Sequence, residues 1–91
     1  MDQDLLHSLE EIFRSYKDPE KITQIIQMYK TINGKNANMH DFIIGSFYGE
    51  STFLFETFNS NDTTPEEFTN ILKDQVEELN SFISNYLEIN K

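Results

Sequence analysis

The chain has 91 residues, in which 16 acidic side chains outnumber 7 basic ones and give a net charge of −9. This length suits one hydrophobic core, so we expect residues 1–91 to form a single domain. The charge opposes direct binding to nucleic acid or to an anionic membrane surface, and the absence of cysteine excludes disulfides, thiolate nucleophiles and cysteine-ligated metal sites.

Two short helices are predicted in the first third of the chain. Within residues 3–16 the apolar side chains recur at the i, i+3, i+4, i+7 spacing of a helix with one buried face. Pro19 disfavours helical geometry at Asp18 but suits the first position of a helix, so the chain should turn a tight corner there. A second helix is expected over 19–32, and the Asn-Gly pair that follows it is typical of a helix end.

Segment 41–58 is ambiguous, because its aromatic and β-branched residues, together with Gly45 and Gly49, could form a β-hairpin. At 100° per residue, however, most of its apolar side chains fall within an arc of about 140°, whereas strict alternation fails. We therefore predict a helix. Phe42 and Phe53 lie outside the apolar arc, on the side of the two glycines, whose spacing would suit either a close backbone crossing or a bend.

The last segment carries the clearest local signals. Thr64 precedes Pro65 and Glu67 as in a capping box, and apolar side chains then recur at steps of four and three residues without a glycine or proline. One long helix is predicted over 65–89. The expected fold is therefore all-α: a small antiparallel, bundle-like domain of four helices with a long C-terminal helix.

The predicted helices differ in length, and this difference suggests self-association. At about 1.5 Å per residue they measure about 21, 21, 27 and 37 Å. In a bundle of four helices side by side, about ten residues of the last helix would lack an intrachain neighbour. We therefore expect a homo-oligomer, such as a homodimer. The residues predicted to bind a partner or a second copy are Phe42, Phe53, Phe82, Ile83, Tyr86, Leu87 and Ile89.

No motif predicts catalysis, a metal or a cofactor. His7 has carboxylates at helical spacing, but the other histidine, His40, lies in the predicted loop, and a zinc site needs three or four converging ligands. Adjacent glutamates point about 100° apart and cannot form an acid–base pair on one helix. The acidic N-terminus and the absence of long apolar runs predict neither a signal peptide nor a membrane span, and hence a cytoplasmic protein.

The negative charge is concentrated in the second part of the chain. Residues 1–40 carry 5 basic and 6 acidic side chains, a net charge of −1, whereas residues 41–91 carry 2 and 10, a net charge of −8. Such a field attracts basic partners and repels nucleic acid, although solubility alone would also favour it. The predicted acidic rim consists of Glu50, Glu56, Asp62, Glu66, Glu67, Asp74, Glu77 and Glu78.

Three functions are compatible with these features. The first is a non-enzymatic protein-binding module of the inhibitor, immunity or adaptor type, in which an apolar helix face provides affinity for a protein partner, a basic one in particular, and the acidic rim orients it. The second is a nucleic-acid mimic that blocks a basic DNA- or RNA-binding protein, with carboxylates in place of phosphates. The third is a structural homo-oligomer without another partner.

Overall fold

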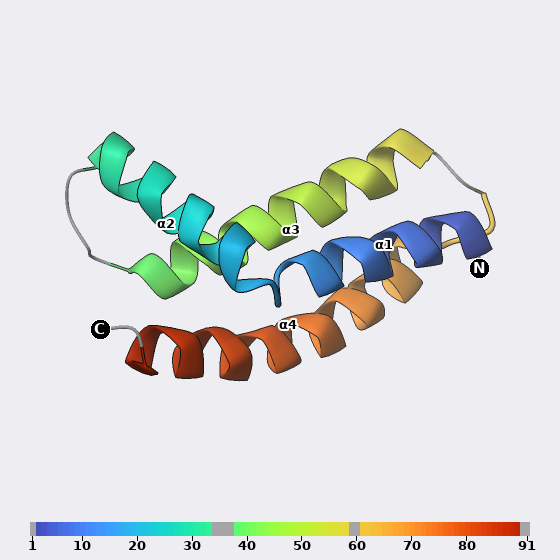
Figure 1. Ribbon diagram of the computed structural model, residues 1–91. Helices are drawn as coiled ribbons and strands as arrows, with labels where there is room; N and C mark the ends of the chain where they lie inside the picture. Colours follow the sequence, from blue (N-terminus) through green and yellow to red (C-terminus); the bar gives the residue numbers. More distant parts are fainter. Residues whose placement is uncertain (1, 34–37, 59–60, 90–91) are drawn as a thin grey trace.

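The computed structural model describes residues 2–33, 38–58 and 61–89, and all four predicted helices are present (Figure 1). No strand occurs within these ranges, so segment 41–58 is a helix and not a hairpin. The third helix begins two residues earlier than expected. The helices are α1 (Gln3–Ser15), α2 (Pro19–Asn33), α3 (Met39–Phe58) and α4 (Pro65–Ile89).

Local capping explains why the helices begin where they do. The carboxylate of Asp2 accepts hydrogen bonds from the first free amides of α1, including that of Asp4 at 2.9 Å. At the start of α4 the capping box is complete: the Thr64 hydroxyl accepts from the Glu67 amide at 3.1 Å, and the Glu67 carboxylate accepts from the Thr64 amide at 3.3 Å. Asp18 accepts from an amide of the first turn of α2 in the same way.

The four helices form three rods, because α1 and α2 lie end to end and not side by side (Figure 1). The joined α1–α2 segment runs in the same direction as α4, and α3 runs back in the opposite direction and contacts α1, α2 and α4. With 13 and 15 residues, α1 and α2 together span about 42 Å, against about 37 Å for the 25 residues of α4. These two rods are therefore similar in length, whereas the 20 residues of α3 span about 30 Å, and the molecule is 43 Å long.

The outer half of α4 is consequently covered by its own chain, and the expectation that it lacks an intrachain neighbour is wrong. Ile83 is completely buried, and Phe82, Tyr86 and Leu87 pack against the core. The Tyr86 hydroxyl lies 2.9 Å from the hydroxyl of Thr23 in α2. Only Ile89, at the end of the helix, is largely exposed.

One continuous core joins the three rods. Its largest fully buried side chains are Tyr16, at the corner between α1 and α2, and Phe47 of α3, whose rings meet edge to face at 5.4 Å. Burial raises the pKa of Tyr16, and the charge of Glu50 and its hydrogen bond to the phenol raise it further, while a hydrogen bond from Ser46 opposes them. The other core residues are Leu5, Leu9, Ile22, Ile25, Ile43, Phe68, Leu72, Leu79 and Ile83.

The two glycines of α3 face open space. A Cβ atom added at Gly45 or Gly49 would meet nothing within 4 Å, so neither glycine serves a close helix crossing with the described part of the chain. Phe42, predicted to lie outside the core, instead packs against the ring of Tyr29 in α2 at 4.7 Å. Within the described ranges no helix combines the length and apolar character needed to cross a bilayer.

Candidate functional site

The residues predicted to form a self-association surface do not come together as an exposed patch. Five of the seven pack within or against the core, as described above. The two that remain exposed are Phe53, at 71%, and Ile89, at 80%. Phe53 lies near the end of α3 that leads into α4, whereas Ile89 is the last residue of α4, so the two lie at opposite ends of the molecule (Figure 1).

The predicted acidic rim divides into two groups. Glu50 and Glu78 face the α1–α2 rod and form ion pairs there, the former with Lys21 at 3.4 Å and the latter with Lys17. Glu67 belongs to the capping box of α4. Asp62 lies in the turn before α4 and has a partner within the chain. The exposed carboxylates that remain on α3 and α4 from this set are Glu56, Glu66, Asp74 and Glu77.

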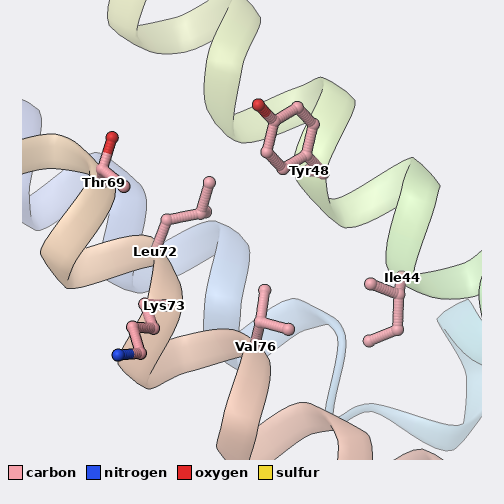
Figure 2. Close-up of a pocket in the computed structure, with 6 residues that line it drawn as sticks. All are labelled: Ile44, Tyr48, Thr69, Leu72, Lys73 and Val76. Atoms are coloured by element: carbon pink, nitrogen blue, oxygen red, sulfur yellow. The ribbon is translucent and has the colours of Figure 1, made fainter. Parts of the chain in front are cut away.

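An open groove between α3 and α4 is the clearest binding feature of the molecule (Figure 2). It has a volume of about 280 Å³, and its walls expose almost only carbon. Tyr48, 56% exposed, leans over it from α3, and the side chains of Leu72 and Val76 approach it from α4. The lining residues are Ile44, Tyr48, Thr69, Leu72, Lys73 and Val76.

The groove is a consequence of the three-rod architecture. Two antiparallel helices in contact leave a furrow on each side of their contact line. The α1–α2 rod fills one furrow of the α3–α4 pair and lies behind it in Figure 2. The register of the pair is set at one end by Phe55, which stacks on Phe68 at 4.4 Å, and at the other by Ile44, which faces Val76 across the groove. The second furrow is the open groove described above.

Carboxylates flank this groove at both ends. On α4, Glu66 and Glu77 lie within about 40° of Lys73 around the helix axis, and both are exposed. On α3, Asp41 lies one turn before Ile44 and within about 20° of Tyr48 around the helix axis, whereas Glu56 follows Tyr48 by eight residues and lies about 80° further around the axis. Because α3 and α4 are antiparallel, Asp41 lies toward the same end of the helix pair as Glu77, and Glu56 lies toward the same end as Glu66. Each end of the α3–α4 pair therefore carries one exposed carboxylate from each helix, and Glu56 lies the farthest around its helix from the groove lining. Asp41 also lies 3.5 Å from Nδ1 of His40.

Lys73 is the single cation on this face. Within residues 38–58 and 61–89 it is the only lysine or arginine, and it lies on the wall of the groove between the two pairs of carboxylates. No ion pair or hydrogen bond of its ammonium group is found with any described residue. In Figure 2 the carbon chain of Lys73 lines the wall while its ammonium group points away from α3, so the exposed side chain would have to rotate to meet an acceptor in the groove.

The groove suits noncovalent binding of an apolar group. No set of three metal-binding side chains gathers anywhere in the described ranges, and His7 contacts only Glu11, at 3.0 Å on the surface of α1. An apolar wall, one aromatic side chain and one cation can hold an apolar side chain and orient its neighbours by charge.

Sequence reasoning missed this groove. The apolar arc of the third predicted helix, about 140° wide, is wider than contact with one neighbouring rod requires, and this width was the available signal. Lys73, alone in a long acidic stretch, was a second one. The chain matches no protein family, no curated protein and no solved structure to a significant degree.

Proposed function

We propose that this chain is a non-catalytic protein-binding module that acts through the face shared by α3 and α4. The observation that carries the proposal is the coincidence of the open apolar groove with the two helices that hold most of the negative charge. Burial of the groove wall would supply affinity. The carboxylates around it would steer and orient a partner of positive charge.

Tyr48 is the residue expected to contribute most to binding. Its ring is large, stands at the edge of the groove and is 56% exposed, so a partner would bury it against Leu72. Tyrosine is enriched among the few interface residues that carry most of the binding energy, because it buries much area at a low cost in conformational entropy.

The groove also supports this proposal over a structural homo-oligomer. The outer half of α4, which motivated self-association, already packs against the core of the same chain, and its Tyr86 hydroxyl meets Thr23 of α2. Two chains of charge −9 that met through their acidic faces would also repel each other.

A nucleic-acid mimic is the second candidate, because both α3 and α4 carry exposed carboxylates. In a mimic, two rows of carboxylates would enclose a polar surface, whereas the groove between α3 and α4 is apolar. The salt dependence of binding distinguishes the two functions. Binding that depends on the carboxylates alone weakens steeply as ionic strength rises, whereas binding anchored by apolar contact does not.

Site-specific photocrosslinking tests the proposal. A photoreactive phenylalanine analogue is placed at Tyr48 in one variant and at Phe53 in a matched control, because both are exposed aromatic positions on α3 and only the first lines the groove. The captured protein is then purified, and its affinity for the wild-type chain and for Tyr48→Ala is measured. We expect capture at Tyr48 alone, and about tenfold weaker binding by Tyr48→Ala.

Three outcomes contradict the proposal. Capture of the same chain, with dimers in solution, would show a structural oligomer. A captured protein that DNA displaces and that moderate salt releases would show a mimic. Equal affinity for the wild-type chain and Tyr48→Ala would show that the groove is not the binding surface.

A further inference from the structure

The shape of the groove selects a helix as its occupant. On α4 the lining runs from Thr69 to Val76, a length of about 10 Å or two helical turns, and on α3 it runs from Ile44 to Tyr48. The matching furrow on the other side of the same two helices already holds a rod of helix, the α1–α2 segment. A further rod in the open furrow would pack by the same ridges-into-grooves geometry.

The charges at the two ends of the groove select basic residues at both ends of that helix. On α4, Glu66 and Glu77 are eleven residues apart, or about 16 Å, and on α3, Asp41 and Glu56 are fifteen residues apart, or about 22 Å. An apolar stripe of two turns that enters the groove would end close to both pairs of carboxylates. Lysine or arginine side chains just beyond each end of the stripe would reach them.

Lys73 would determine the position and direction in which such a helix binds. Along α4 it follows Glu66 by seven residues and precedes Glu77 by four, so the charges on this wall read negative, positive, negative with unequal spacing. A complementary helix would read basic, acidic, basic with the same unequal steps. A carboxylate opposite the Lys73 ammonium would therefore fix both the position and the direction of the bound helix.

We infer that the groove binds an amphipathic α-helix of a partner protein, with a two-turn apolar stripe between basic residues and an acidic residue opposite Lys73. The inference rests on the proposed function and names the kind of partner that its site would take. The same charges disfavour a second copy of this chain, whose net charge is −9, as well as nucleic acid and anionic lipid.

Synthetic peptides of about 18 residues serve as probes for the full chain. The first has a leucine stripe, flanking lysines and one glutamate placed to meet Lys73. The second contains the same residues in an order that leaves no apolar face. The third keeps the stripe but replaces each lysine by glutamate. Binding is followed by fluorescence anisotropy of the labelled peptides, and the site is located by the backbone amide NMR shifts of the protein.

We expect the first peptide to bind at least tenfold more tightly than either of the others and to shift the amides of α3 and α4 around the groove. Tyr48→Ala should weaken this binding about tenfold, whereas Phe53→Ala, a matched change on α3 outside the groove, should leave it unchanged. Equal binding of the first two peptides, shifts elsewhere on the molecule, or no binding up to about 1 mM would overturn the inference.

A charge exchange tests the role of Lys73. In the chain, Lys73→Glu should weaken binding of the first peptide severalfold, and a peptide with lysine in place of its central glutamate should recover the loss. Additive effects of the two changes, without recovery, would overturn the assigned register.

Identification of the natural partner tests this inference and the proposed function separately. A partner that requires Tyr48 but presents a loop, a strand or an acidic helix would refute the inference and leave the protein-binding function intact. A partner whose binding is indifferent to Tyr48 would refute the function itself.

Discussion

Substitution of Ile83 by alanine tests the arrangement on which the groove depends. Ile83 lies in the half of α4 that would be uncovered in a bundle of four helices side by side. In the structure it is completely buried. The change removes three carbon atoms, worth about 2.4 kcal/mol at about 0.8 kcal/mol per methylene. The cavity left behind adds to this loss, so we expect unfolding to require about 3 kcal/mol less free energy.

Urea denaturation followed by circular dichroism measures this loss. Ile89→Ala is the matched control, because it makes the same chemical change six residues later on the same helix, where the side chain is 80% exposed. We expect the control to alter the stability by less than about 0.5 kcal/mol. A domain of this size is stable by about 5–10 kcal/mol, so the difference between the two variants is easily resolved.

Each measurement is made at two protein concentrations about tenfold apart. If the rest of the same chain covers Ile83, the midpoints are independent of concentration. If a second copy covers it, the wild-type midpoint rises with concentration, because association stabilises the folded state by mass action. That result, or a loss below about 1 kcal/mol in Ile83→Ala, would refute the end-to-end packing of α1 and α2 along α4.

Three further substitutions test the core and the caps. The raised pKa of Tyr16 means that above pH 10 the unfolded chain releases a proton that the folded chain retains, so stability falls by up to about 1.4 kcal/mol per pH unit. Urea midpoints should therefore decline less steeply from pH 9 to 11 in Tyr16→Phe than in the wild type, and parallel declines would contradict this. Ser51→Ala should raise the melting temperature, because the Ser51 hydroxyl is buried without a hydrogen-bond partner; a lower value would show that the hydroxyl is satisfied. Thr64→Ala should destabilise the fold by about 1 kcal/mol through loss of the α4 cap, whereas the exposed Thr57→Ala should change stability much less, and equal losses would argue against the cap.

The helices could be predicted from the sequence because their signals are local. Pro19 ends one helix and begins another through its own ring geometry, and the capping box at Thr64 needs only residues within one turn. The relation between α1 and α2 is not local. A short connection is compatible with either a hairpin or a corner, and burial of Tyr16 against Phe47 on α3 stabilises the corner. Periodicity shows which face of a helix is apolar but not which neighbour covers it.

The same limit explains why periodicity alone predicts an uncovered outer half of α4. Four unequal helices side by side would leave Ile83 and Tyr86 uncovered, whereas in the structure two of the helices join into one rod and both residues pack within or against the core. The groove was missed for the converse reason. Leu72 and Val76 belong to the apolar stripe of α4 and also line the groove. The sequence of α4 by itself does not show which part of its apolar stripe the neighbouring helices cover.

The acidic side chains of α3 and α4 differ in the ion pairs that they form. Where these helices face the α1–α2 rod, each carboxylate in reach meets a lysine: Glu50 pairs with Lys21, and Glu78 with Lys17. On the groove side Glu56, Glu66 and Glu77 meet no lysine or arginine among the described residues. The chain thus pairs two acidic side chains with lysine where its own helices pack, and leaves these three glutamates without such a pair among the described residues. A partner that filled this furrow with a basic helix would repeat there the pairing that α1 and α2 already make on the opposite side.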